Sequence, residues 1–103
     1  MSLISAVLER GRKLDGRQGR RIKVFLKARM LSEGQALEIH LLDISQLGAL
    51  AHAPSERTPN EIVWVAVKGV EILARVAWTR GNRFGLNFNT PLPQLHLDRL
   101  VKA

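Results

Sequence analysis

Two arginines with three residues between them, Arg17 and Arg21, lie where a glycine-rich basic segment meets the first stretch of β-like alternation. A guanidinium group can form paired hydrogen bonds to a phosphate or to the O6 and N7 atoms of guanine, and it can stack on a base. Lysine supplies only part of this chemistry. The same spacing also occurs in solvated surface clusters. Arg17 and Arg21 are candidate ligand-binding residues, and Arg20 between them either assists or points to water.

A second polar motif, Asp43-x-Ser45-x-x-Gly48, follows about twenty residues later, at the end of the second alternating stretch. Asp and Ser at a strand end usually cap a turn by hydrogen bonding to backbone N–H groups, and Gly supplies unusual backbone angles. In a functional interpretation, Asp43 accepts hydrogen bonds from a guanine edge, Ser45 adds a polar contact and Gly48 permits close backbone approach. The two interpretations are compatible.

The aromatic residues are few, and we expect most of them in the core. Trp78 follows Val76 on an alternating face, which is typical of a core position. Alternatively, Trp78 lies at the surface as a stacking platform, which is worth about 1–3 kcal/mol per base. The other aromatic residues are predicted to pack in the interior: Phe25, Trp64, Phe84 and Phe88.

The basic residues are concentrated at the N-terminal end of the chain. The net charge is +7, and residues 1–29 contain nine basic and two acidic side chains, whereas the remainder contains seven of each. Such a polarised distribution creates a local positive field that attracts phosphate groups. An anionic partner is the first hypothesis.

The pattern along the chain predicts three parts within one domain. Residues 1–21 comprise a short amphipathic helix near 3–10 and a flexible basic arm, residues 22–90 a β-barrel, and residues 91–103 a helical tail. Alternation of apolar and polar residues indicates six strands. They are expected near 22–30, 37–42, 48–53, 61–68, 70–79 and 84–89.

The absence of a helix long enough to cross between parallel strands favours an antiparallel sheet that closes on itself. The predicted fold class is therefore all-β, a six-stranded antiparallel barrel with short N- and C-terminal helical segments. With 46% hydrophobic and 24% charged residues in 103, the composition suits a single folded domain.

Several classes of function lack the residues they require. The chain has no cysteine, no apolar run of membrane-spanning length and no signal-peptide pattern, so we expect a cytoplasmic protein. The three histidines, His40, His52 and His96, have no metal-ligand spacing, so no metal site is expected. No hydrolase or kinase motif is present, and we expect neither an enzyme nor a cofactor.

The combination of motifs resembles the PilZ domain from about Arg17 to Pro91. It includes the two arginines, the Asp43-x-Ser45-x-x-Gly48 turn, and the sequences ARVAW at 74–78 and FGLNF at 84–88. The resemblance implies a bacterial cyclic di-GMP receptor with a six-stranded barrel. It also implies that Arg17 and Arg21 contact the ligand's phosphates and guanines, with Asp43, Ser45 and Gly48 forming the opposite wall.

Two positions depart from the PilZ pattern. Leu47 replaces a frequent second glycine, which leaves the shape of the turn open, and Gly16 replaces a basic residue found in relatives that bind a stacked ligand pair. The second departure favours one ligand per site. The function expected is a stand-alone adaptor: cyclic di-GMP orders the N-terminal arm, and the new surface signals to a separate, unidentified protein.

Two alternatives stay open. In the first, a PilZ-like barrel acts through protein contacts alone and does not bind nucleotide. In the second, a small barrel binds RNA or single-stranded DNA nonspecifically through its basic arm. The sequence disfavours this second role. Such proteins place several aromatic residues on the binding face, whereas this chain is 5% aromatic, with most of these residues on apolar faces.

Overall fold

The computed structural model describes residues 20–102. The helix expected near 3–10, most of the basic arm and Arg17 lie outside the described residues. The described part contains six strands and one helix. Their bounds are β2 Ile22–Ser32, β3 Gln35–Ile44, β4 Gly48–His52, β5 Ile62–Val67, β6 Val70–Arg80, β7 Arg83–Phe88 and α2 Gln94–Val101.

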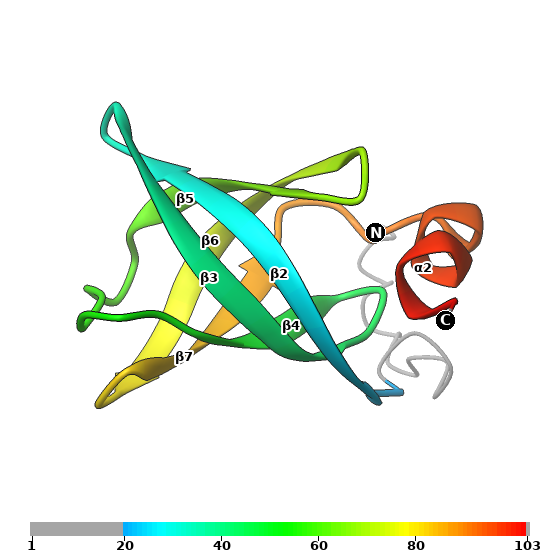
Figure 1. Ribbon diagram of the computed structural model, residues 1–103, viewed down its shortest axis with the longest axis horizontal. Coiled ribbons are helices and arrows are strands. Elements are labelled where there is room, and N and C mark those ends of the chain that lie inside the picture. The colour runs from blue at the N-terminus through cyan, green and yellow to red at the C-terminus, as the bar shows by residue number, and fades with distance from the viewer. Residues whose placement is uncertain (1–19, 103) are drawn as a thin grey trace, which may run out of the picture.

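The six strands form a closed barrel in the order β2-β3-β4-β7-β6-β5, and every neighbouring pair is antiparallel (Figure 1). Short turns join β2 to β3, β5 to β6 and β6 to β7, as expected for hairpins. Closure pairs β2 with β5 through Arg29, Met30 and Leu31. The predicted fold class is confirmed, and so is the C-terminal helical segment.

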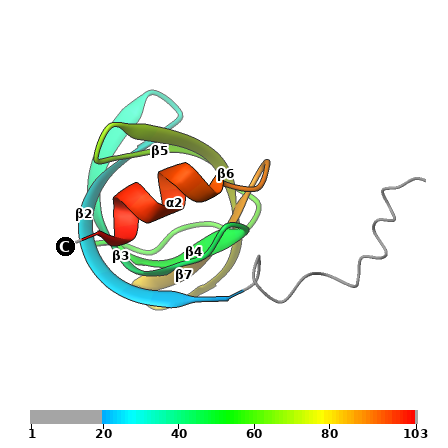
Figure 2. The ribbon, with the colours of Figure 1, turned by 90° about the vertical axis from the view of Figure 1, so that its right-hand side faces the viewer.

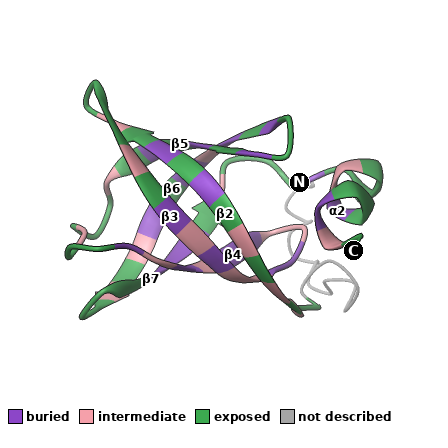
Figure 3. Cartoon of the chain, in the orientation of Figure 1, coloured by how far each residue is buried: buried purple, intermediate pink, exposed green. Residues whose placement is uncertain are grey.

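The barrel interior is filled by the inward side chains of every strand. Buried and exposed residues alternate along β2, β5 and most of β6, as the period-two pattern predicts (Figure 3). A six-stranded barrel is narrower than an eight-stranded one, so small side chains suit its interior. Those that are almost fully buried include Ala28, Ala49, Ala51, Ala53, Ala74, Val63, Val65 and Val76. The core is therefore packed, and a ligand must bind outside it.

Helix α2 lies across one end of the barrel, as the view in Figure 2 shows. Leu97 and Leu100 are buried on the side of the helix that faces the core. The segment before the helix is anchored to the β3–β4 turn by two hydrogen bonds between Gln46 and Leu92. The Gln46 side-chain amide donates to the Leu92 carbonyl at 2.7 Å, and the Leu92 N–H donates to the Gln46 carbonyl at 2.7 Å. The tail thus closes the core and braces this turn.

Two of the predicted core aromatics are on the surface instead. Phe25 is 73% exposed and Trp64 is 48% exposed, whereas Phe84 is fully buried and Phe88 packs against the core. In both strands the neighbouring aliphatic residues occupy the inward positions, so alternation turns these rings outward. The packing prediction was wrong for Phe25, whose ring stacks on His40 with centroids 4.7 Å apart.

A polar cluster joins the end of β2 to the loop before β5. The Glu61 carboxylate accepts hydrogen bonds from the Ser32 hydroxyl and from the Arg57 guanidinium, the latter at 2.6 Å. The Thr58 N–H donates to the same carboxylate. Burial alone raises the pKa of Glu61, but the hydrogen bonds from Arg57, Ser32 and Thr58 outweigh burial and hold the pKa below its ordinary value of 4.5.

Replacing Glu61 with Gln should lower the free energy of unfolding by about 1–3 kcal/mol near neutral pH, because the charged hydrogen bonds are lost. The folded-state pKa lies below the unfolded one, so the stabilisation is fully present above about pH 4.5 and disappears as pH falls through the folded value. Urea unfolding of the parent and Glu61→Gln across this range measures the difference. A gap that stays constant into strong acid would contradict the assignment.

Candidate functional site

Four residues on the outer face of the barrel are successive cross-strand partners. Asp43 of β3 pairs with Leu50 of β4, Leu50 pairs with Gly85 of β7, and Gly85 pairs with Trp78 of β6. Neighbouring strands are about 4.8 Å apart, so this row extends about 14 Å across the sheet. It brings together the acidic residue of the second motif and the tryptophan of the ARVAW sequence.

A β-bulge in β3 turns Asp43 outward. Ile39 and Leu41 face the core, and unbroken alternation would place Asp43 on the same side. Between Leu41 and Asp43 the register with β4 shifts, so that Leu42 is an extra residue. The shift returns Asp43 to the outer face and leaves Ile44 facing the core.

A second bulge does the same for Trp78. The register between β6 and β7 shifts between Val76 and Trp78, with Ala77 as the extra residue. Val76 is fully buried, whereas Trp78 is 46% exposed. Of the two placements that the sequence left open for Trp78, the core placement was wrong, because it extends the alternation through a bulge. The alternative of a surface position is what the structure has.

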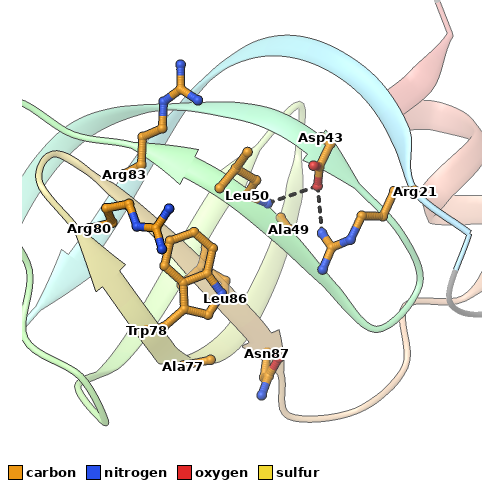
Figure 4. A pocket seen from close by; sticks show the side chains of 11 residues that line it. Arg21, Asp43, Ala49, Leu50, Ala77, Trp78, Arg80, Arg83, Leu86 and Asn87 are labelled. Carbon is orange, nitrogen blue, oxygen red and sulfur yellow. Dashed lines mark hydrogen bonds and ion pairs between the residues drawn. The ribbon is translucent and has the colours of Figure 1, made fainter.

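Arg21 and Asp43 form an ion pair, although they are 22 positions apart in the chain. The Arg21 guanidinium contacts Asp43 Oδ1 at 2.8 Å, and the Leu50 N–H donates to the same oxygen at 3.1 Å (Figure 4). Asp43 is largely shielded, whereas the Arg21 side chain is more than half exposed. Within residues 20–102, no hydrogen bond involves the second carboxylate oxygen, Oδ2. This carboxylate is held rigidly and retains capacity for a further donor.

These side chains line a surface pocket of about 430 Å³. Its volume is within the usual range for small-molecule sites. Arg21 and Asp43 are at one end, and Trp78 with two further arginines is at the other (Figure 4). Three guanidinium groups against one carboxylate favour an anionic ligand. The lining residues are Arg21, Asp43, Ala49, Leu50, Ala77, Trp78, Arg80, Arg83, Gly85, Leu86 and Asn87.

Ser45 and Gly48 build the turn beside the pocket and are not among its lining residues. The Ser45 hydroxyl accepts hydrogen bonds from the N–H groups of Leu47 and Gly48 at 3.1 and 3.2 Å, and Ser45 is buried. A Cβ atom on Gly48 would be 2.2 Å from the Leu86 carbonyl oxygen. The turn-forming interpretation of this motif fits these contacts, and Gly48 allows close approach between β4 and β7.

The chain resembles known proteins in both sequence and structure. The family model of the PilZ domain matches residues 15–103. The chain belongs to the PilZ domain family. The structure is similar to the PilZ domain of CeSA from a cellulose-synthesizing bacterium, with a TM-score of 0.57 and 17% identity over 78% of this chain and 90% of that one. A search of curated proteins finds no match.

PilZ domains are in general cyclic di-GMP receptors and adaptor modules. Of the motif residues of this PilZ domain, the structure brings Arg21 and Asp43 into contact and places Ser45 and Gly48 in the adjoining turn. Arg20 is exposed and does not line the pocket, and Arg17 lies outside the described residues. Within residues 20–102, no helix is long and apolar enough to cross a membrane, and no three His, Asp or Glu side chains are grouped for a metal ion.

Two arginines of this PilZ pocket were not among the residues predicted from the sequence. Arg80 and Arg83 flank the β6–β7 turn and are direct cross-strand partners. The only sequence signal was the Arg-Gly-Asn-Arg turn itself, whose ends must face the same side of a tight hairpin. Because the sequence left open whether Trp78 faces inward or outward, it did not show that Arg80 and Arg83 lie on the side of the barrel that carries the pocket.

The Trp78 indole packs against Gly85. A Cβ atom at position 85 would be 2.2 Å from the indole Nε1 and 2.6 Å from Cε2. The ring therefore lies directly over the glycine backbone. This contact fixes the height of the indole above the sheet and leaves the ring at the pocket wall.

The Gly85→Ala substitution should lower the free energy of unfolding by about 1–3 kcal/mol, because the added methyl group overlaps the indole. In a Trp78→Leu background the same substitution should cost much less, because the overlapping ring is gone. Urea unfolding followed by far-ultraviolet circular dichroism gives all four stabilities of the cycle. Equal costs in the two backgrounds would show that Gly85 does not act through Trp78.

Proposed function

We propose that this PilZ domain is a receptor for cyclic di-GMP and that the ligand binds in the pocket between Arg21 and Trp78. The observation that carries the proposal is the direct Arg21–Asp43 contact. It joins the two polar motifs, and an exposed indole lies three strands away on the same row. Membership of the PilZ family supports the same ligand.

Each side chain in the pocket has a chemical role suited to this ligand. Arg21, together with Arg17, pairs with a phosphate or with the O6 and N7 atoms of a guanine. Asp43 accepts hydrogen bonds from a guanine N–H edge through the oxygen that is not occupied by Leu50. Trp78 offers its ring face to a base. Ser45 and Gly48 act by holding the turn beside the pocket.

The energies are sufficient for a signalling ligand. A charge-assisted hydrogen bond contributes about 1.5–3 kcal/mol, and base stacking on Trp78 about 1–3 kcal/mol. Micromolar binding requires about 8 kcal/mol after the costs of association and ordering are subtracted. Two arginines, one carboxylate and one indole together reach this range. A single bound ligand is the simplest occupancy.

The proposed response is a change in the N-terminal arm. The arm carries Arg17 four residues before Arg21, so a ligand held by both arginines would fix the arm against the barrel. The resulting surface would be recognised by a separate protein, and the domain would act as a cytoplasmic adaptor without catalysis. A form of this fold that binds proteins but no nucleotide is the alternative, and direct ligand titration distinguishes them.

The nucleic-acid alternative was set aside because the aromatic residues were expected in the core. That premise was wrong, since Phe25, Trp64 and Trp78 are exposed. However, Trp64 pairs with Leu31 and Leu73, and Trp78 pairs with Gly85, so the two indoles belong to different rows of the barrel. The exposed rings do not form one continuous stacking surface, and the cyclic dinucleotide is the better candidate.

Calorimetric titration with cyclic di-GMP should give micromolar binding by the parent. The substitutions Arg17→Ala, Arg21→Ala and Asp43→Ala should each weaken it at least about tenfold, because each removes a charged contact worth more than 1.4 kcal/mol. Arg75→Ala is the matched control, because Arg75 is an exposed arginine of β6 that does not line the pocket. Unchanged binding by Arg21→Ala and Asp43→Ala would show that the site is elsewhere.

Cyclic di-GMP should also raise the melting temperature of the parent, whereas GMP and cyclic GMP at the same concentration should not. Trp78→Leu should reduce the affinity for cyclic di-GMP by about five- to hundredfold through lost stacking. Trp64→Leu is the control, since Trp64 is similarly exposed but lies on β5. Equal effects of the two substitutions would remove Trp78 from the site.

A further inference from the structure

A second outward row of the barrel consists of basic residues and histidines. Lys27 of β2 pairs with His40, His40 with His52, and His52 with Arg83. The row ends with Arg80, which pairs with Arg83. All five side chains are exposed or half-buried. Five positions on neighbouring strands extend about 19 Å around the barrel.

The placement of these cations is unfavourable for the stability of the sheet. Like charges directly opposite one another are destabilising, and Arg80 faces Arg83 as a direct partner. One acidic side chain reaches the row, Glu38, which is 3.4 Å from Lys27. Within residues 20–102, neither Arg80 nor Arg83 has an ion-pair partner. The far end of the row is therefore a concentration of positive charge that the described part of the chain does not neutralise.

The basic row meets the proposed ligand pocket at the Arg80–Arg83 pair. Both residues line the pocket. In Figure 4 the Arg80 side chain extends towards Trp78, whereas Arg83 points away from it. Arg80 thus extends over the Trp78 side of the pocket, and Arg83, which pairs with His52, connects the pocket to the row that continues through His40.

We propose that the row Lys27–His40–His52–Arg83–Arg80 is the docking surface for an acidic polypeptide segment of the partner protein. Lysine and arginine supply permanent cations, and the two imidazoles between them can donate N–H hydrogen bonds to carboxylates. A length of about 19 Å matches about six residues of extended chain. A segment rich in Asp or Glu would neutralise the repulsion along the row.

Charge complementarity favours a polypeptide over a nucleic acid here. A nucleic-acid strand gains much of its affinity by stacking bases on a series of aromatic rings. In the described part of the chain, two aromatic rings neighbour the row: Trp78, towards which Arg80 extends, and Phe25, one face of which is already stacked on His40. They lie on β6 and β2, at opposite ends of the row, and do not form a series. Carboxylates need only cations and N–H donors, which are what the row offers.

The proposal is tested with the full chain and a fluorescein-labelled deca-glutamate peptide, by fluorescence anisotropy at low and physiological ionic strength. The Lys27→Gln/Arg83→Gln double variant should bind the peptide about tenfold more weakly than the parent, because two cations leave the row. The matched control, Lys68→Gln/Arg75→Gln, removes the same charge from positions outside the row. It should change the affinity by less than about twofold.

Equal weakening by the two double variants would overturn the proposal, because the peptide would then sense overall charge. The proposal also fails if a labelled ten-nucleotide oligothymidylate binds more tightly than the peptide and loses affinity in the row variant. Arg83→Gln alone, at the junction with the pocket, should weaken peptide binding about threefold. Circular dichroism confirms folding of each variant.

A second measurement rests on the proposed cyclic di-GMP function. The ligand's two phosphates would lower the positive potential at Arg80 and Arg83, so saturating cyclic di-GMP should weaken peptide binding by about three- to tenfold, and the peptide should weaken ligand binding by the same factor. If the parent binds the peptide through the row but not cyclic di-GMP, only the proposed function fails. If both bind without influencing each other, the link through Arg80 and Arg83 is wrong.

Discussion

The site depends on two β-bulges that interrupt the alternation of a narrow, closed barrel. Without the extra residue at Leu42, Asp43 would face the apolar interior, and without Ala77, Trp78 would do the same. A charged carboxylate in that interior would be costly, and a tryptophan would have to displace side chains that already fill it. The bulges solve both problems at once, because they direct the two side chains to the same outer row.

The rest of the site follows from holding that row rigid. Gly48 lets β4 lie close to β7, and Gly85 lets the indole lie directly on the sheet. Ser45 fixes the turn through its N–H contacts, and Gln46 of the same turn holds the tail segment at Leu92. In the Arg21–Asp43 ion pair, the Arg21 side chain is more than half exposed, whereas Asp43 is largely shielded. The wall is thus preorganised, and Arg21 is its more exposed contact to Asp43.

Sequence patterns predicted the barrel well because its inward residues follow a simple period of two. The order of the two polar motifs also predicted that Arg21 and Asp43 would meet. That prediction did not depend on knowing whether each side chain faces inward or outward. It was harder to predict whether a single side chain faces the core or the surface. Phe25 and Trp64 were assigned to the core because large aromatic residues usually are, and for Trp78 the core and the surface both stayed open. Apolar alternation contains no sign of a bulge. It also does not show that in this barrel valine side chains lie inside, whereas both tryptophans lie outside.

Arg80 and Arg83 were missed for the same reason, and their position explains how a rigid barrel could transmit a signal. The core is packed, so a ligand on the surface has no cavity through which to deform it. What the proposed dianionic ligand would change is the charge of the outer face. Because the Arg80–Arg83 pair belongs both to the pocket and to the basic row, an electrostatic response needs no movement of the strands. In the proposed function, the fold supplies fixed positions, and the message is a change in the charge that a partner would meet there.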